Sequence, residues 1–311
     1  MPTAAMNDAF PAARSIGAAL PRGSFDFFVF GVFRTAVNLR LEGSDMVASL
    51  MGPSGEGFPG AIALAAEVDF RDLGVAAGAH GRLDDSSLVL EARPRPLRVG
   101  LDGARRLAAR PVPRIARIGE AFRVVRAELG RIQASLNTEL RIDALGDTTQ
   151  SRTAAAVTIG RAAAGLARDP RDPPAAAIRL LVGTGPGLTP AGDDFLSGYL
   201  ASAAARPDMG FAILAREAEA AASATNELSA SLLRQASRGH FPTALIDLAE
   251  TLVEDSSPAA VTALRRLCAH GHSSGTDMAS GFLFGLGASE RPLAEFDDCA
   301  FGIGRRRQHA S

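Results

Sequence analysis

The chain has 311 residues, which is enough for two domains that each bury a core. Its 33 basic and 34 acidic residues leave a net charge of −1, which excludes a global positive field that would attract nucleic acid or an anionic membrane. The chain contains no lysine, so Schiff-base chemistry and a Walker loop are also excluded.

Short apolar runs separated by turn residues characterise the first third of the chain. We expect a mobile tail over residues 1–22, and the runs that follow predict strands. These predicted strands cover residues 25–33, 35–41, 46–51, 61–70, 87–91 and 97–101. They indicate a small all-β domain, a barrel or a sandwich, over residues 23–105.

Alanine, leucine and arginine at helical spacing dominate the rest of the chain. The predicted helices cover residues 118–136, 154–167, 175–181, 190–200, 211–238 and 275–286, and two more begin near Pro242 and Pro258. We therefore predict a helical domain over residues 106–290 and a tail over residues 291–311. The expected fold class is α+β, with the β domain first.

The composition predicts a cytoplasmic protein without a membrane partner. Cys268 and Cys299 are too few for a disulfide framework and are expected to be reduced thiols. Residues 1–23 lack the apolar core of a signal peptide, and no window approaches the roughly 20 apolar residues that span a bilayer.

A glycine-rich motif, Gly-Thr-Gly-Pro-Gly-Leu-Thr-Pro-Ala-Gly-Asp-Asp at residues 183–194, is the most unusual stretch of the sequence. Its glycines permit positive φ angles, and Thr189 followed by Pro190 is typical of a helix start, with Thr189 as the N-cap. Such a loop predicts an anion site built from backbone N–H groups, and a plain turn is the alternative. A dinucleotide fingerprint is excluded, because Leu188 stands where its third glycine is needed.

A second motif repeats the first. Residues 275–283, Gly-Thr-Asp-Met-Ala-Ser-Gly-Phe-Leu, align without gaps on residues 192–200, although chance similarity in a chain rich in small residues is the alternative. The Ser-Gly pair in each segment predicts two helices that pack closely and bring Asp194 and Asp277 into one cleft. The two carboxylates could hold a divalent cation, bind the donors of an amide substrate, or only stabilise their helix N-termini. The sequence indicates no certain cofactor and leaves Mg²⁺ open.

The predicted site combines both motifs. The expected catalytic residues are Asp194, Asp277 and His272. The expected substrate-binding residues are Gly185, Gly187, Leu188, Thr189, Asp193, Asn226, Ser273, Ser274 and Gly275. For Asn226, which shares a helix face with Ser229, a solvated face is an equal alternative.

Two other kinds of site fit poorly. Residues 271–275 match the pattern G-x-S-x-G, but the hydrolase elbow needs a preceding strand and residues 259–269 predict a helix. Cys268, His270 and His272 do not converge as metal ligands at their spacing.

The two motifs resemble those of a bacterial family that includes the third subunit of oxamate carbamoyltransferase, an enzyme of allantoin degradation in purine catabolism. Ala-Val-Asn-Leu at residues 36–39 extends the similarity into the β region. The resemblance implies carbamoyl transfer, in which oxalurate and phosphate interconvert with oxamate and carbamoyl phosphate, and it implies other enzyme subunits as partners. A small-anion binding or regulatory module without turnover is the alternative.

Overall fold

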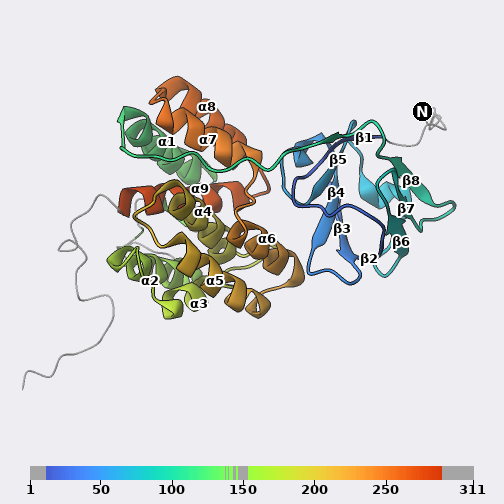
Figure 1. Ribbon diagram of the computed structural model, residues 1–311, viewed down its shortest axis with the longest axis horizontal. Coiled ribbons are helices and arrows are strands. Elements are labelled where there is room, and N and C mark those ends of the chain that lie inside the picture. The colour runs from blue at the N-terminus through green and yellow to red at the C-terminus, as the bar shows by residue number, and fades with distance from the viewer. Residues whose placement is uncertain (1–11, 137, 139, 143–144, 146–152, 289–311) are drawn as a thin grey trace, which may run out of the picture. The chain divides into compact units, whose positions relative to one another are not determined.

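The protein is described by a computed structural model, which covers residues 12–136, 138, 140–142, 145 and 153–288. The chain divides into two compact units. The β unit comprises Met1–Pro111 and Ala230–Ile246, and the helical unit comprises Val112–Ser229 and Asp247–Ser311. The predicted class, an α+β fold with the β region first, is confirmed (Figure 1).

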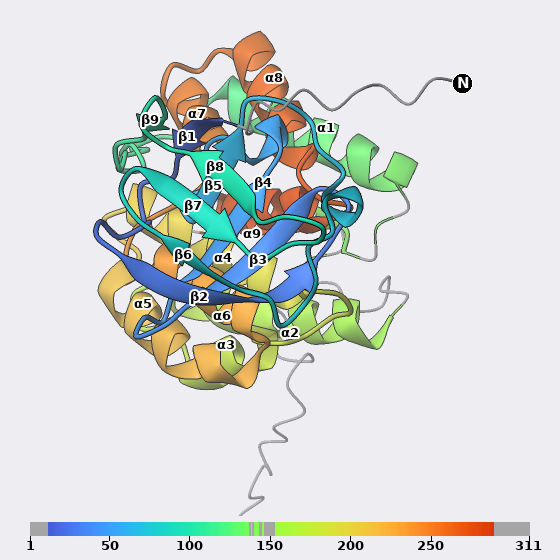
Figure 2. The same ribbon diagram turned by 90° about the vertical axis from the view of Figure 1, so that its right-hand side faces the viewer.

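Nine strands of the β unit form a curled sheet (Figure 2). The strands are β1 Ala13–Ile16, β2 Phe25–Val32, β3 Ala36–Leu41, β4 Val47–Met51, β5 Ala61–Leu64, β6 His80–Leu83, β7 Ser87–Leu90, β8 Leu97–Gly100 and β9 Arg105–Arg106. Their order across the sheet is β8-β7-β6-β2-β3-β4-β5-β1-β9. A parallel bridge between Ala12 and Gly100 connects the residue before β1 with β8.

Three features of the β unit differ from the predictions. Strand β1 lies within the segment that we expected to be a mobile tail, and it pairs with β5 and β9. Strand β6 was not predicted, because Gly81 and the charged Arg82 interrupt its apolar pattern. The strand predicted over residues 61–70 ends at Leu64, and Phe70 begins a short 3-10 helix instead.

The helical unit is built around a central pair of helices, α4 and α9. The helices are α1 Glu120–Leu136, α2 Ala154–Arg168, α3 Ala175–Leu181, α4 Ala191–Ala205, α5 Phe211–Ala221, α6 Glu227–Ser237, α7 Thr243–Val253, α8 Ser257–Cys268 and α9 Ser274–Ala288. Helices α6 and α7 each have residues in both units. Helices α1 and α8 pack with α9, whereas α3 and α5 pack with α4 (Figure 1).

The long helix predicted over residues 211–238 is wrong, because the chain leaves the helical conformation at its middle. Helix α5 ends in a 3-10 turn, and Thr225 is extended, with φ −113° and ψ −178°. The Asn226 Oδ1 atom then accepts a hydrogen bond of 3.1 Å from the Ser229 backbone N–H. Asn226 therefore caps a new helix, α6, and this cap outweighs the helical propensity of the surrounding alanines.

Helices α4 and α9 cross with their backbones in contact at paired glycines, as predicted. A Cβ added to Gly198 would overlap the Met278 carbonyl oxygen and lie 2.8 Å from the Phe282 backbone nitrogen. A Cβ added to Gly281 would overlap the Phe195 carbonyl oxygen and lie 3.0 Å from the Tyr199 nitrogen. Only glycine allows so close an approach.

These contacts are related by an approximate two-fold relationship between the helices. In the alignment of the two motifs, Gly198 corresponds to Gly281, and each glycine contacts the residues that correspond to those touched by the other. A glycine at the start of each helix also lies against the backbone of a neighbouring helix. A Cβ on Gly192 would overlap the Leu181 carbonyl oxygen at the end of α3, and one on Gly275 would overlap the Leu267 carbonyl oxygen in α8.

The crossing predicts a strong penalty for adding one methyl group at its centre. We expect Gly198→Ala to lower the free energy of unfolding by about 1–3 kcal/mol, because the backbones must separate. Gly287→Ala in the same α9 is a matched control, since its added Cβ would lie 3.4 Å from Phe122 in ordinary contact. Urea unfolding of both variants tests this, and equal stabilities would contradict the crossing.

Candidate functional site

The loop between α3 and α4, residues 183–190, carries the first motif. Gly183, Gly185 and Gly187 have φ angles of 74°, 117° and 98°, a region that other residues rarely adopt. The glycines therefore fold the loop in the way that the sequence predicted. A Cβ on Gly187 would meet open space, so this part of the loop is accessible to a ligand.

Backbone donors face no acceptor along this loop. Within the described residues, the N–H groups of Gly185, Gly187, Leu188 and Thr189 have no hydrogen-bond partner. Exposed and unpaired N–H groups clustered on a glycine-rich loop are typical of anion-binding sites.

The first turn of α4 itself offers fewer donors than predicted. Thr189 is not the N-cap, because α4 begins at Ala191 with Pro190 in the cap position. The Pro190 carbonyl accepts hydrogen bonds from the Asp193 and Asp194 N–H groups, of 2.9 and 3.2 Å. Among the described residues the Ala191 N–H of this turn also has no acceptor, so most of the free donors belong to the loop.

The Thr189 hydroxyl group links the two motifs instead. Its Oγ1 atom lies 2.6 Å from the Ser274 Oγ atom, at the start of α9. The two motif turns are therefore adjacent in the helical unit.

Asp194 and Asp277 are both buried beside this link, with 4% and 2% of their surfaces exposed. Burial, together with the nearby Asp277 carboxylate, raises the pKa of Asp194 well above its usual range. The Ser274 and Thr189 hydroxyl groups oppose this increase in part. Asp194 therefore keeps its proton to a higher pH than an exposed aspartate does, and its Oδ2 atom has no hydrogen-bond partner in the described part of the chain.

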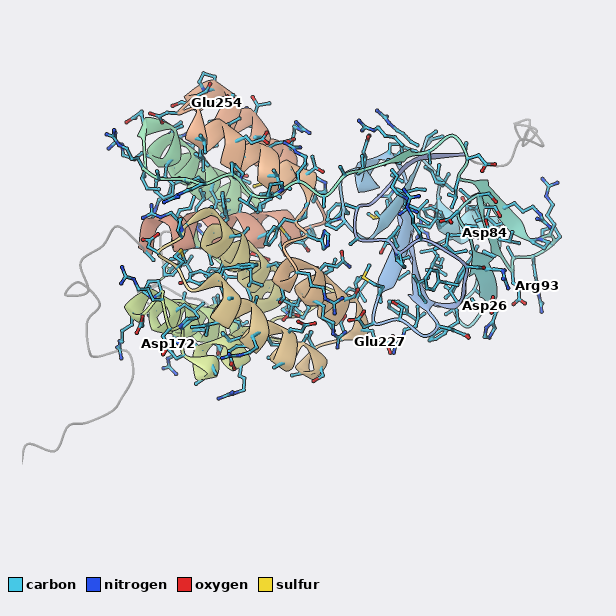
Figure 3. All side chains as sticks on the ribbon, in the orientation of Figure 1. Asp26, Asp84, Arg93, Asp172, Glu227 and Glu254 are labelled. Carbon is cyan, nitrogen blue, oxygen red and sulfur yellow. The ribbon has the colours of Figure 1, made fainter. Side chains whose placement is uncertain are left out.

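This burial sets the acidic residues of the site apart from ordinary surface charges. Asp172 and Glu254 are exposed on the helical unit (Figure 3). The carboxyl groups at the starts of α4 and α9 are instead enclosed by protein. Isolated carboxylates are rarely buried without a functional or structural reason.

Asp193 has a different environment, because its oxygens are satisfied within the chain. Its Oδ1 atom accepts a hydrogen bond of 2.8 Å from the Gly183 N–H, and its Oδ2 atom accepts one of 2.6 Å from the Thr225 hydroxyl. Burial raises the pKa of Asp193, whereas these hydrogen bonds and the nearby Ser229 hydroxyl group lower it in part. Asp193 thus connects the loop with the start of α6.

The turn before α9 supplies the second half of the predicted site. Its backbone N–H groups at Gly271, His272 and Ser273 donate to no acceptor among the described residues, and Gly271 has a φ angle of 64°. The His272 side chain is exposed, and Ser273 is half-buried. Gly275 lies against α8, as described above, so it allows α8 and α9 to approach closely.

The structure brings together Thr189, Asp194, Ser274 and Asp277 from the predicted set. Asn226 is exposed and caps α6. Thr225 and Ser229, which were not predicted as site residues, contact Asp193. The signal for them was the pattern of a helix N-cap at residues 225–229, which the helical propensity of the flanking residues concealed.

The arrangement of the described side chains offers little support for a metal site. Among the described residues, no three His, Cys, Asp or Glu side chains are grouped so that they could hold a metal ion. Burial raises the pKa of Cys268 to about 12, so its thiol is not a ready ligand.

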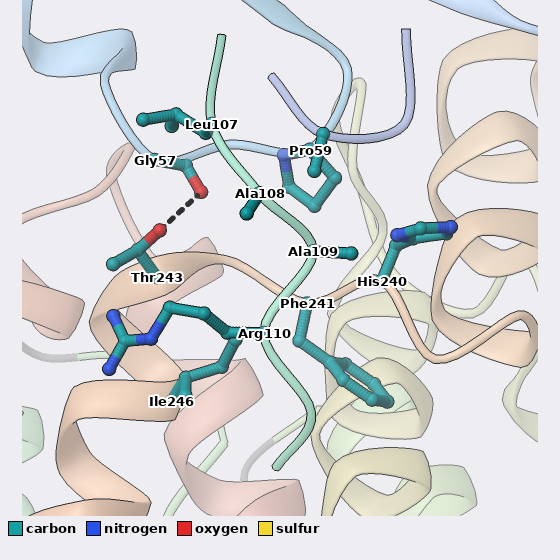
Figure 4. Close-up of a pocket in the computed structure, with 11 residues that line it drawn as sticks. Gly57, Pro59, Leu107, Ala108, Ala109, Arg110, His240, Phe241, Thr243 and Ile246 are labelled. Atoms are coloured by element: carbon teal, nitrogen blue, oxygen red, sulfur yellow. Dashed lines mark hydrogen bonds between the residues drawn. The ribbon is translucent and has the colours of Figure 1, made fainter. Parts of the chain in front are cut away.

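A small cavity elsewhere, in the β unit, does not involve the motifs (Figure 4). Its volume of about 20 Å³ is sufficient for one water molecule. Its lining residues are Ala18, Gly57, Pro59, Leu107, Ala108, Ala109, Arg110, His240, Phe241, Thr243 and Ile246. The Thr243 hydroxyl donates a hydrogen bond of 3.3 Å to the Gly57 carbonyl there.

Both motif turns, helix α4 and all but the end of α9 lie within a segment that resembles a known family. Residues 181–286 match the family model of the oxamate carbamoyltransferase subunit AllH. The predicted resemblance is therefore confirmed for this segment, while the similarity at residues 36–39 lies outside the match.

No curated protein and no solved structure matches the chain. In the part of the chain that the structure describes, no helix has both the length and the apolar character needed to cross a membrane.

The buried acid predicts an unusual dependence of stability on pH. Asp194 ionises near pH 3.9 in an unfolded chain but at a higher pH in the folded one, so stability falls as pH rises from about 4 through the folded pKa. Asp194→Asn removes this titration. Its free energy of unfolding, relative to the wild type, should therefore increase by up to about 1.4 kcal/mol per pH unit in that window.

Urea unfolding at several pH values above 4 measures this difference. Asp172→Asn, at an exposed aspartate, is the matched control and should follow the wild-type curve. Parallel curves for the wild type and Asp194→Asn would show that Asp194 is ionised in the folded protein.

Proposed function

We propose that the chain is a subunit of an oxamate carbamoyltransferase-like enzyme that interconverts oxalurate and phosphate with oxamate and carbamoyl phosphate. The observation that carries this proposal is the combination, within the AllH match, of two turns with unpaired N–H donors and a buried carboxylic acid with an unpaired oxygen. Oxalurate and phosphate are both anions, and oxalurate also carries amide groups. The backbone donors would bind the anionic groups, and the buried acid would bind an amide group.

Phosphate would bind at the loop of residues 183–190. The N–H groups of Gly185, Gly187 and Leu188 would donate to its oxygens, and Thr189 would add a fourth donor. The turn at Gly271, His272 and Ser273 would hold the carboxylate of oxalurate or oxamate. Two separate donor clusters support a reaction between two anions, since each cluster offsets the charge of one of them.

The carboxyl pair would recognise the carbamoyl group. A protonated carboxyl group donates one hydrogen bond and accepts another, which matches the carbonyl oxygen and the N–H of an amide. Asp194 Oδ2 lacks a partner, and the carbamoyl group would supply it. Thr189 and Ser274 are half-buried above it, so exchange of their mutual hydrogen bond for one to substrate would give access. We favour this alternative over a divalent cation, because among the described residues no three His, Cys, Asp or Glu side chains are grouped so that they could hold one.

In the proposed reaction a phosphate oxygen attacks the carbamoyl carbon of oxalurate, and the bond from that carbon to the amide nitrogen breaks. The proton of hydrogen phosphate passes to the departing nitrogen, and oxamate and carbamoyl phosphate result. His272, in its exposed position, would relay this proton, and Asp277 would help to orient the carbamoyl group. The loop donors would hold the reactants in place, so proximity would provide much of the acceleration. No covalent intermediate on the protein is needed.

A small-anion binding module without turnover is the second candidate. The near-complete burial of Asp194 favours it for the isolated chain, because a substrate must displace hydroxyl groups to reach the acid. Binding and turnover are separated by the two experiments that follow.

Phosphate should stabilise the isolated chain against heat. A hundredfold excess over the dissociation constant adds about 2.7 kcal/mol to the free energy of unfolding. Gly187→Val should abolish this stabilisation, because the branched side chain blocks the approach to the loop N–H groups. Gly78→Val is the matched control, since Gly78 is exposed, has a φ of 85° and meets open space. Equal stabilisation of both variants by phosphate would place the anion elsewhere.

Turnover should depend on the buried acid. Phosphorolysis of oxalurate, measured as oxamate release with and without partner subunits, should be lost in Asp194→Ala while phosphate binding is retained. Asp194→Asn is the matched control and should keep more of the activity, because an amide, like a protonated carboxyl group, donates and accepts a hydrogen bond. Phosphate binding without turnover under either condition would support the binding module, and full activity of Asp194→Ala would contradict the role of the acid.

A further inference from the structure

The connection between α5 and α6 holds the glycine-rich loop at two points. Thr225 reaches the beginning of the loop through Asp193, and Ser229 reaches its far end at Leu188. The loop has three residues at positive φ and would otherwise have wide conformational freedom.

The first contact runs through a bridging carboxyl group. Asp193 accepts hydrogen bonds from the Thr225 hydroxyl at 2.6 Å and from the Gly183 N–H at 2.8 Å, one on each oxygen. A Cβ on Gly183 would lie 3.1 Å from the Ala224 carbonyl oxygen, so the backbones are also in close contact. The position of Gly183 therefore depends on Thr225.

The second contact sets the direction of a backbone donor. The Ser229 hydroxyl donates a hydrogen bond of 3.3 Å to the Leu188 carbonyl oxygen. That carbonyl and the Thr189 N–H belong to one planar trans peptide group, in which they point in opposite directions. Because Ser229 holds the carbonyl on the protein side, the Thr189 N–H points away from Ser229.

We propose that Thr225 and Ser229 are positioning residues, which keep the loop donors of residues 185–189 aligned for an anion. The identity of this anion rests on the proposed function, whereas the effect of the two hydroxyl groups on the loop does not. The break between α5 and α6 thus has a role, because a continuous helix would lack the extended residue that presents Thr225. Because the loop donors are already aligned before an anion binds, the loop does not have to become ordered on binding, and the entropic cost of binding is lower.

A probe in the loop tests its order without any ligand. The chain has no tryptophan, and Leu188 is 43% exposed, so Leu188→Trp introduces a single reporter. In this background, Thr225→Val and Ser229→Ala should each increase acrylamide quenching of the tryptophan and reduce its fluorescence anisotropy. Thr225→Ser should restore the original values, because it keeps the hydroxyl group.

Binding is measured separately, without the tryptophan. Calorimetric titration with inorganic phosphate should give a dissociation constant about tenfold higher for Thr225→Val than for wild type, the size expected for one lost hydrogen bond to a charged group. Thr225→Ser should again restore it. Thr251→Val in α7 is the matched control, since its hydroxyl donates only to the Leu248 carbonyl of the same helix, at 2.8 Å.

The outcomes separate the two proposals. Quenching and phosphate affinity that change no more in Thr225→Val and Ser229→Ala than in Thr251→Val would overturn the positioning role. A melting temperature lowered in all three variants, with loop order and affinity unchanged, would also overturn it in favour of a purely structural role. If quenching changes as expected but the wild type binds no phosphate, the positioning role is supported and the proposed ligand is wrong.

Discussion

Backbone contact between α4 and α9 is the interaction on which the helical unit depends. Glycine at the crossing removes the side chains that would separate the helices, and glycine at each start seats the helix against its predecessor. These glycines lower the helical propensity of α4 and α9, and tight packing between the two helices must offset that loss. Because the crossing fixes both helices along their lengths, it also fixes where their first turns lie.

The electrostatics of the site follow from that contact. Asp194 and Asp277 occupy equivalent first turns, so bringing the helices together also brings two acidic groups together out of water. Retaining a proton on Asp194 reduces the cost of this arrangement. The unpaired backbone donors of the two turns lie in the same part of the helical unit as this pair of acids, together with the Thr189 and Ser274 hydroxyl groups.

Sequence patterns predicted the parts of the molecule that local chemistry determines. The α+β order, the close crossing and the positive φ angles follow from apolar periodicity and from glycine positions. The cap at Asn226 and the strand at residues 80–83 were missed, because one hydrogen bond and the pairing of β6 with its neighbours outweighed local propensity. The burial of Asp194 and the bond between Thr189 and Ser274 depend on packing between distant segments, which no local pattern records.

The seating of each helix start on a carbonyl of the preceding helix has an evolutionary consequence. Gly192 and Gly275 anchor α4 and α9 directly, so the turns that precede them do not determine where the helices begin. Insertions, deletions or new side chains in those turns can therefore accumulate while the paired acids keep their places. A scaffold of this kind allows the two turns to change without redesign of the interior.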